Sequence, residues 1–425
     1  MKLKISSIII LVLILILYFI PAKKTDFFKT YPKKDKVSDN LKELYKDTIK
    51  TITVNKVEWK YYTTGKGKEN LLFLHGMGGA YDLWWQQIHF FKDKYKVITY
   101  TLPTEIDNLE DAFEGIQAIL KQEKIDRLNI VGTSMGGYIA QYLVKKIPDQ
   151  IEKAVFSNTF PPNTDLLQDN LTKSKIIPYL PEIVIQKFGE KSLREKLLPA
   201  GENDPLLKAF LPSLPFSKKS FINRFHVVVD PFIINPCAYK IKRIPKLIIE
   251  SDNDPLVKKK LREDLKNLYP NAQVYTFHNK GHFPYINEVE VYNKSIYNFL
   301  LKKNPYLNIE KTVSNYFTGR KQANIKLLQD TFLKNAVLIG KINEDEMPSV
   351  IPFLNYLDIV KKQGVQDIET SILDADITNN MAFCKTLFKY KDKDYIDYLT
   401  LFKEAENWKI VSKTFTKKSS KIFFT

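Results

Sequence analysis

The sequence is poor in cysteine, with Cys237 and Cys384 as the two cysteines in 425 residues. Two cysteines far apart in the chain cannot form a disulfide framework, and neither has neighbours at the spacing of a metal site. An Arg-rich stripe, an RNP-like aromatic motif and zinc-finger spacing are lacking as well. Despite a formal net charge of +17, the sequence therefore predicts no nucleic-acid binding, because its lysines are scattered over every segment.

The composition also lacks the features of a disordered chain. Hydrophobic residues make up 44% of the sequence and aromatic residues 13%, so the chain can bury enough apolar surface to fold. At roughly 100 to 200 residues per domain, a chain of this length is expected to form two or three domains.

The first 24 residues contain the longest apolar run. Lys2 and Lys4 precede an uncharged stretch from Ile5 to Ala22, which as a helix would reach about 27 Å, enough for a thin bilayer core. An A-x-A-like cleavage site is lacking. Residues 1–24 therefore predict a signal anchor or transmembrane helix, with a cleaved signal and a buried helix as alternatives. The expected location is a bacterial inner membrane with the domains exported, although lysines after the run leave the side open.

The next segments predict a stalk and an α/β domain. Residues 25–50 are polar, with a short helix expected near Leu41–Ile49. Residues 51–303 alternate strand and helix patterns, which predicts a mostly parallel sheet covered on both faces. The expected strands are 53–62, 71–74, 96–101, 128–131, 246–250 and 273–278, and the expected helices are 109–122, 135–146 and 289–301.

Two regions depart from this alternation. Residues 161–243 are rich in Leu, Pro and Lys with helix-like runs, which predicts an inserted helical cap. Residues 304–425 predict a separate α+β domain, because two helical patterns are followed by a strand, a helix and four more strand-like runs. The expected helices there are 310–317, 321–332 and 350–362, and the expected strands are 336–341, 367–378, 382–390, 395–404 and 408–415.

A strand, a G-x-S-x-G motif and a helix follow one another directly at residues 128–146. On such a sharp turn Ser134 would present its hydroxyl beyond the strand end, while Gly132 and Gly136 relieve crowding around the strained backbone. The helix that follows favours negative charge at its N-terminus. Ser134 is therefore the expected nucleophile, and a glycine-rich packing turn is the alternative interpretation.

A serine nucleophile needs a base, and that base needs an orienting acid. His282, in a Gly-His pair after a strand, is the expected base, and Asp254 is the expected acid. His278 and His89 are alternative bases that suit a strand end and a helix surface better. Asp252 lies two residues from Asp254 and stays open as an alternative acid.

The oxyanion formed by serine attack needs two fixed N–H donors. The backbone N–H of Met135, directly after the nucleophile, is the expected first donor. The second is expected from the turn His75-Gly-Met-Gly-Gly79, most simply the N–H of Met77, because clustered glycines let the backbone approach a substrate closely.

Residues from about 53 to 301 resemble the α/β-hydrolase fold family, with its HG oxyanion turn, nucleophile elbow, late acid and GH base. Within it, residues 131–141 and the segment Ser157-Asn-Thr-Phe160 are similar to the maspardin-like branch. The family pattern G-x-x-D places its glycine at Ser251, which selects Asp254 as the acid. The loop usually found after the 96–101 strand is replaced by Leu102-Pro-Thr-Glu-Ile106, a shortening that the maspardin-like branch shares.

Residues 305–415 resemble the NTF2-like superfamily, of the lumazine-binding or SnoaL-like sort. The resemblance is carried by Val313-Ser-Asn-Tyr-Phe-Thr-Gly319, the 328–338 stretch, Asp397-Tyr-Leu-Thr-Leu401 and Asn407-Trp-Lys-Ile-Val-Ser-Lys413. It implies a curved sheet with a cone-shaped cavity that often pairs with a second copy. Binding, or a homodimer through the C-terminal domain, is thus expected more than catalysis.

Together these features predict a serine hydrolase that cleaves a carboxylic ester through an acyl-enzyme on Ser134, with no cofactor or metal. The expected substrate is a small-molecule or lipid ester. The membrane is the other expected partner, through the N-terminal helix. A non-catalytic, maspardin-like binding or scaffold protein is the alternative, and the triad alone does not distinguish esters from amides.

Overall fold

The computed structural model describes residues 16–163, 165–341, 347–405 and 407–418. These residues form two compact units. The first comprises the described residues up to Pro236 together with Ile244–Lys302. The second comprises Cys237–Arg243 together with the described residues from Lys303 onward.

The first unit is built on an eight-stranded sheet with the order β1-β2-β4-β3-β5-β6-β7-β8. Strands β3 to β8 pair in parallel with one another, whereas the β1–β2 and β2–β4 pairs are antiparallel. This arrangement confirms the predicted α/β architecture. The strands are β1 (Lys50–Val54), β2 (Val57–Thr64), β3 (Glu69–Leu74), β4 (Tyr95–Thr101), β5 (Leu128–Thr133), β6 (Ile151–Ser157), β7 (Lys246–Ser251) and β8 (Gln273–Phe277).

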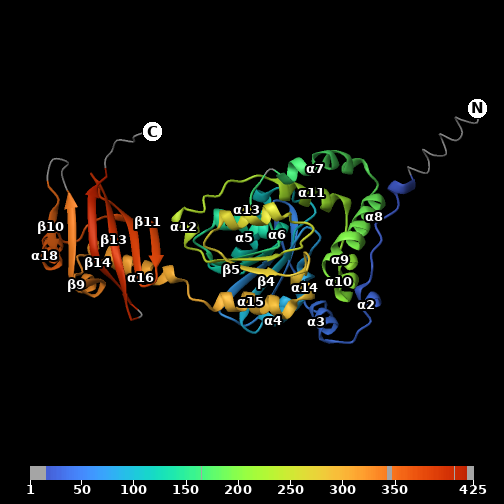
Figure 1. Ribbon diagram of the computed structural model, residues 1–425, viewed down its shortest axis with the longest axis horizontal. Helices are drawn as coiled ribbons and strands as arrows, with labels where there is room; N and C mark the ends of the chain where they lie inside the picture. The colour runs from blue at the N-terminus through green and yellow to red at the C-terminus, as the bar shows by residue number, and fades with distance from the viewer. Residues whose placement is uncertain (1–15, 164, 342–346, 406, 419–425) are drawn as a thin grey trace, which may run out of the picture. The chain divides into compact units, whose positions relative to one another are not determined.

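Helices cover both faces of this sheet, as expected for parallel strands joined by crossovers. Helices α4 (Trp85–Phe91) and α15 (Val289–Leu301) lie on one face, and α5 (Leu109–Gln122), α6 (Met135–Lys146) and α13 (Lys259–Leu268) lie on the other (Figure 1). Every residue of the central strand β5 is buried. The carboxyl end of β5 therefore projects Ser134 from a rigid, fully packed strand.

The single strand expected at residues 53–62 is instead the hairpin of β1 and β2. Asn55 and Lys56 adopt φ values of 50° and 68°, and Val54 pairs with Val57 across the turn. Two successive residues with positive φ make the tight turn whose twist suits a hairpin. Apolar residues alternate on both sides of this short turn, which explains why the pattern predicted one strand.

Between β6 and β7 the chain is largely helical, including α7 (Asp165–Ile176), α8 (Glu182–Ser192), α10 (Pro205–Phe210) and α11 (Lys218–Val229). Its last helix, α12 (Tyr239–Lys242), groups with the second unit. There Tyr239 joins the apolar core and donates a 2.7 Å hydrogen bond to Glu310. The predicted cap boundary at 243 is therefore too late, because residues 237–243 pack with the other unit.

Residues 25–50 do not form the predicted polar stalk. They contain α2 (Phe27–Thr30) and α3 (Lys36–Leu44), and Phe27, Tyr31 and Leu41 are buried in the core of the first unit. The Phe27 ring meets Phe210 of α10 edge-on at 5.8 Å. The few apolar residues of this mostly polar segment thus anchor it to the cap, which the average composition did not indicate.

The membrane-anchor prediction is corrected by the structure. Within the described ranges, which begin at residue 16, no helix has the length and apolar character that crossing a membrane requires. Residues 5–15 of the predicted span lie outside the described residues. The predicted inner-membrane location accordingly has no support, and the membrane as a partner stays a prediction.

The second unit combines a six-stranded sheet with helices. The strand order is β10-β9-β14-β13-β12-β11, with β14 and β9 parallel and the other pairs antiparallel. Its elements are α16 (Pro305–Lys321), α17 (Ile325–Thr331), β9 (Phe332–Lys341), β10 (Ser349–Pro352), α18 (Phe353–Gln363), β11 (Glu369–Thr378), β12 (Met381–Lys389), β13 (Asp394–Glu404) and β14 (Asn407–Lys417). This β-rich architecture agrees with the predicted α+β domain.

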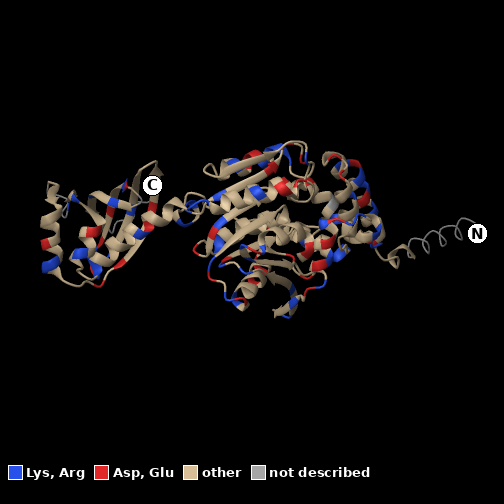
Figure 2. Ribbon diagram, turned by 90° about the horizontal axis from the view of Figure 1, so that it is seen from below, with Lys and Arg blue, Asp and Glu red and all other residues tan. Residues whose placement is uncertain are grey.

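Charged residues of both signs are interspersed on the elements of both units (Figure 2). Lysines and arginines outnumber acidic residues, 65 to 48.

The contacts of Phe27 lead to a stability prediction. Phe27→Ala should lower the free energy of unfolding of the first unit by about 3 kcal/mol, because it removes a ring that is 4% exposed. Phe19→Ala is the matched control, since that ring is 85% exposed. Tryptophan fluorescence during urea unfolding would measure both, because Trp59, Trp84 and Trp85 lie in the first unit. Equal midpoints for both variants would contradict the anchoring role of Phe27.

Candidate active site

Ser134 lies on a strained turn between β5 and α6. Its φ of 53° and ψ of −122° are unusual for a residue with a side chain, and strain of this kind persists only where surrounding contacts impose it. Those contacts hold both backbone groups. The Ser134 N–H donates to Ser157 O at 3.0 Å, and the Thr159 hydroxyl donates to Ser134 O at 2.6 Å. The serine hydroxyl is thus presented from a fixed backbone, as a nucleophile requires.

The glycines of the motif are required by close backbone contacts. A Cβ added to Gly132 would lie 2.2 Å from Gly136 O, and one added to Gly136 would lie 2.1 Å from Leu74 O. Both distances are far below van der Waals contact. The absence of side chains at these positions lets α6 start directly against the ends of β3 and β5.

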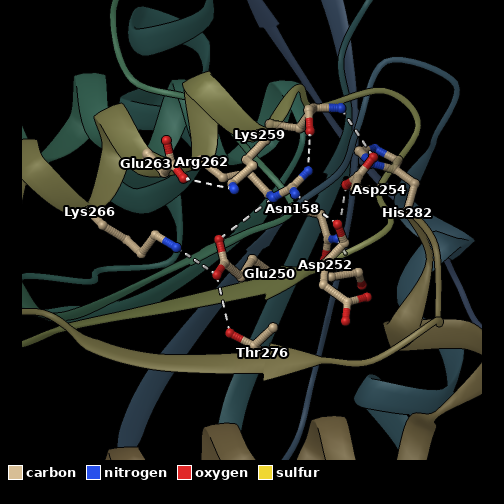
Figure 3. Close-up of polar contacts among 12 residues, drawn as sticks. Asn158, Glu250, Asp252, Asp254, Lys259, Arg262, Glu263, Lys266, Thr276 and His282 are labelled. Carbon is tan, nitrogen blue, oxygen red and sulfur yellow. Dashed lines mark hydrogen bonds and ion pairs between the residues drawn. The ribbon is translucent and has the colours of Figure 1, made fainter.

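His282 and Asp254 form a buried pair. His282 Nδ1 lies 2.7 Å from Asp254 Oδ2, and the two residues are 3% and 6% exposed (Figure 3). A carboxylate accepts, so Nδ1 carries the proton and donates, which leaves Nε2 of a neutral imidazole as the basic nitrogen. This is the arrangement that a general base needs beside a serine hydroxyl.

Further donors keep Asp254 ionised. Burial by itself would raise the pKa of Asp254, but the charge of His282 and hydrogen bonds from His282, Asn158 and the Leu256 N–H outweigh it, so the pKa lies below the usual value. Asn158 donates to Asp254 Oδ2 at 3.0 Å and has a φ of 42°. Sequence analysis gave Asn158 no role, because only the fold brings the end of β6 beside the acid turn.

The alternative acid and bases occupy other places. Asp252 accepts a 2.7 Å hydrogen bond from His278 Nδ1, and this second Asp–His pair is exposed to solvent. His89 lies on the exposed surface of α4. The structure therefore brings only His282 together with Asp254 in a buried setting.

A buried arginine holds the turn that carries Asp254. Arg262, on α13, donates to Val257 O at 2.6 Å and to Asp252 O at 2.8 Å, on either side of the acid in sequence. Glu250, at the end of β7, lies 3.8 Å from Arg262 and also accepts from Lys266 and Thr276 (Figure 3). This cluster closes the acid turn against the sheet.

The expected oxyanion turn lies directly beside the nucleophile. A Cβ added to Gly76 would be 3.3 Å from Ser134 Cβ. Gly76 O accepts from His75 Nδ1 at 2.7 Å and from the Gly79 N–H at 2.9 Å. In a trans peptide the next N–H points opposite to that carbonyl, so the Met77 N–H points away from His75 and is left available as a donor.

His75 is held as a neutral ring. Its Nε2 accepts from the Leu102 N–H at 2.9 Å, and the residue is completely buried. Burial, with a smaller contribution from the charge of Arg224, lowers the pKa of His75 to about 3. His75 thus connects its own turn with the loop after β4, because Nδ1 donates to Gly76 O and Nε2 accepts from Leu102. Since both ring nitrogens are hydrogen bonded, His75 is not available as a base.

Arg224 of the cap helix α11 clamps the same turn. Its guanidinium donates to Met77 O at 2.7 Å, to Gly79 O at 2.9 Å and to Leu102 O at 2.9 Å, and the residue is 5% exposed. Arg224 was not predicted from the sequence, because a single arginine in a helical cap carries no motif. Its contacts make the cap part of the machinery that shapes the oxyanion turn.

The Ser134 hydroxyl and His282 are not hydrogen bonded to each other among the interactions of the described residues. Such contacts are often long in a free enzyme and tighten when substrate binds. The linings of two surface cavities, of about 630 and 610 Å³, do not include Ser134 or His282. Within the described ranges, no cluster of His, Cys, Asp or Glu could hold a metal ion.

Comparison with known families matches each unit separately. Residues 69–197 match the family described as "alpha/beta hydrolase fold". Residues 306–416 match the family described as "Putative lumazine-binding". The first match includes Ser134 and the oxyanion turn, and the second covers most of the second unit.

Individual relatives resemble the first unit. Maspardin of Mus musculus is 24% identical over 243 residues, which cover 54% of this chain and 74% of maspardin. A 3-oxoadipate enol-lactonase of Acinetobacter baylyi is 29% identical over 124 residues, 27% of this chain and 45% of the lactonase. The solved enol-lactonase of Burkholderia xenovorans LB400 has a TM-score of 0.53 at 17% identity and covers 60% of this chain and 100% of its own, which shows a shared fold.

The buried Asp–His pair predicts selective reactivity of Ser134. A fluorophosphonate probe should label the wild-type protein at Ser134, because an activated serine reacts far faster than an ordinary hydroxyl. Ser134→Ala and His282→Ala should abolish labelling, whereas His278→Ala should retain it, since His278 belongs to the exposed pair. Mass spectrometry of labelled peptides would identify the site. Loss of labelling in His278→Ala but not His282→Ala would reverse the assignment of the base.

The Arg224 clamp predicts a slower reaction without loss of the nucleophile. Arg224→Lys keeps the charge but cannot reach three carbonyls, so the labelling rate should fall by about tenfold or more, as expected when an oxyanion donor is displaced. Lys219→Met is the matched control on the same helix, because Lys219 pairs with Glu105 at the surface. Circular dichroism would establish equal folding. Unchanged labelling in folded Arg224→Lys would show that the clamp does not position Met77.

Proposed function

Because the chain belongs to the α/β-hydrolase fold family and carries a C-terminal lumazine-binding-type domain, we propose that it is a serine hydrolase cleaving a carboxylic ester. The observation that carries this proposal is the buried His282–Asp254 pair. It lies at the carboxyl ends of the strands, where the strained Ser134 turn also projects. All three residue types of a hydrolytic triad occur there in the chain order of this fold.

In the proposed reaction, Ser134 Oγ attacks the ester carbonyl carbon while His282 Nε2 accepts the hydroxyl proton. The carbonyl oxygen becomes an oxyanion that the Met77 and Met135 N–H groups bind. The tetrahedral intermediate then collapses, and the alcohol leaves with the proton from His282. Water, deprotonated by His282, attacks the acyl-enzyme, and a second collapse releases the acid and restores Ser134.

Asp254 acts on this sequence through His282. Its carboxylate fixes the imidazole tautomer and stabilises the imidazolium that exists after each proton transfer. The lowered pKa of Asp254 keeps the carboxylate charged at neutral pH, and the hydrogen bond from Asn158 fixes its orientation. The charge of Asp254 stabilises the imidazolium more than the neutral imidazole, as selective stabilisation of a transition state requires.

Support for an ester comes from the lactonase relative, since a lactone is an internal ester. The expectation of a lipid-like ester rested on the membrane anchor, so the proposed substrate is a small-molecule ester. The similarity to maspardin favours the alternative of a non-catalytic binding protein. That alternative predicts a correctly folded protein whose Ser134 does not react.

A homodimer through the second unit is proposed as well. Phe383, Tyr398 and Phe402 lie on adjacent strands β12 and β13 and are 49%, 48% and 42% exposed. Aromatic residues exposed together on one sheet face are typical of a protein interface. Sedimentation of wild type beside Tyr398→Lys would test this face, and a wild-type monomer would exclude the dimer.

Turnover of a graded ester series tests the proposed reaction. The full chain should hydrolyse 4-nitrophenyl esters faster than the matching 4-nitroanilides, because the alcohol is the better leaving group. Ser134→Ala should lower kcat/KM by roughly a thousandfold or more, with His278→Ala as the control that stays near wild type. Faster cleavage of the anilides would make the protein an amidase. Absence of turnover together with absence of fluorophosphonate labelling would favour the binding protein.

A further inference from the structure

A cluster of charged side chains is buried inside the second unit, although the proposed hydrolysis does not use it. Arg320 on α16, Asp397 on β13 and Lys413 on β14 are 7%, 1% and 8% exposed. Burial of an ionised group is costly unless its charge is compensated, so each charge in the cluster needs a partner.

Asp397 and Lys413 compensate each other. Lys413 Nζ lies 2.9 Å from Asp397 Oδ2 and donates to the Tyr316 hydroxyl at 2.8 Å, while Tyr316 donates to Asp397 at 2.7 Å. A lysine ammonium has three N–H donors, so one remains after these two contacts. Burial lowers the pKa of Lys413 despite Asp397, and the charge of Arg320 adds to this lowering.

Arg320 has no carboxylate partner among the described residues. One terminal nitrogen donates to the neutral amide of Gln363, and the other, Nη1, is buried without a hydrogen-bond partner. With Asp397 neutralised by Lys413, the cluster therefore carries one uncompensated positive charge. Unpaired buried guanidinium nitrogens are rare in folded proteins, and an anionic ligand would supply a partner for this one.

Aromatic rings surround these cationic donors. Arg320 lies 6.0 Å from the Tyr390 ring centroid, and Lys413 lies 4.8 Å from that of Phe415. Tyr390, Tyr395 and Phe415 are partly buried and pack in a chain, with ring centroids 5.7 and 6.5 Å apart. Partly exposed rings at the edge of a buried cationic cluster suit a ligand whose anionic head enters first and whose body is apolar.

We propose that the second unit binds a monocarboxylate with an aromatic or aliphatic body, held by Arg320 Nη1 and the remaining N–H of Lys413. A single negative charge balances the single excess positive charge, and carboxylate oxygens match the guanidinium donors geometrically. A phosphate dianion would leave a buried negative charge unbalanced. The site is independent of the Ser134 chemistry.

Titration calorimetry on the full chain tests this site with benzoate, hexanoate, benzyl alcohol and inorganic phosphate. Benzoate or hexanoate should bind, and benzyl alcohol should bind at least about tenfold more weakly, because it lacks the charge that Arg320 recognises. Hydrogen exchange with bound carboxylate should show protection in peptides that contain Arg320 and Lys413. Protection near Ser134 alone would place the ligand in the hydrolase unit and overturn the proposal.

Matched variants complete the test. Arg320→Gln should weaken carboxylate binding by about tenfold or more, whereas Lys385→Gln should leave it unchanged, since Lys385 is on the same sheet but stacks on the exposed Tyr398 ring. Ser134→Ala should also bind normally, which separates this proposal from the fate of the hydrolase proposal. Equal affinity for alcohol and acid, preference for phosphate, or no binding of any carboxylate would each overturn it.

Discussion

The left-handed backbone of Ser134 is the constraint on which the active-site side of the first unit depends. A non-glycine residue at a φ of 53° is stable only if neighbours fix it from several directions. Ser157 O and the Thr159 hydroxyl fix its peptide groups, and two glycines allow the backbones of β3, β5 and α6 to meet. The same approach brings the expected oxyanion turn beside the serine, so the strain and the position of this turn have one origin.

The two loops that flank this serine are irregular, so several of their carbonyls are not satisfied by a regular ladder. A buried arginine supplies donors to each. Arg224 contacts three carbonyls around the oxyanion turn, and Arg262 contacts two around the acid turn. A guanidinium suits this role because its five N–H groups diverge in a fixed plane. The cost of burying each charge is offset by several backbone dipoles, and by Glu250 for Arg262.

Sequence alone predicted the sheet and placed Ser134, His282 and Asp254 at loops that meet, because each signal is local and lies at a strand end. The catalytic roles of Ser134, His282 and Asp254 stay predictions that labelling and kinetics would test. The same holds for the backbone N–H groups of Met77 and Met135 as oxyanion donors. The contacts of Asn158 with Asp254 and of Arg224 with Met77 could not be found, since they span 96 and 147 residues of chain and no local pattern indicates either one. The prediction of a polar stalk at residues 25–50 was wrong, because a few buried aromatic side chains pack this mostly polar segment against the first unit.

The path of the chain between the units has a consequence for synthesis. The chain passes into the second unit at Cys237, returns at Ile244 and leaves again at Lys303, so the units are joined by three covalent crossings. Helix α12 is synthesised before β7 and β8, whereas its partners Glu310 and Asp374 are synthesised after both strands. Tyr239 must therefore stay without its native neighbours while the hydrolase sheet is completed. A nascent chain of this protein needs protection at one short segment until translation ends.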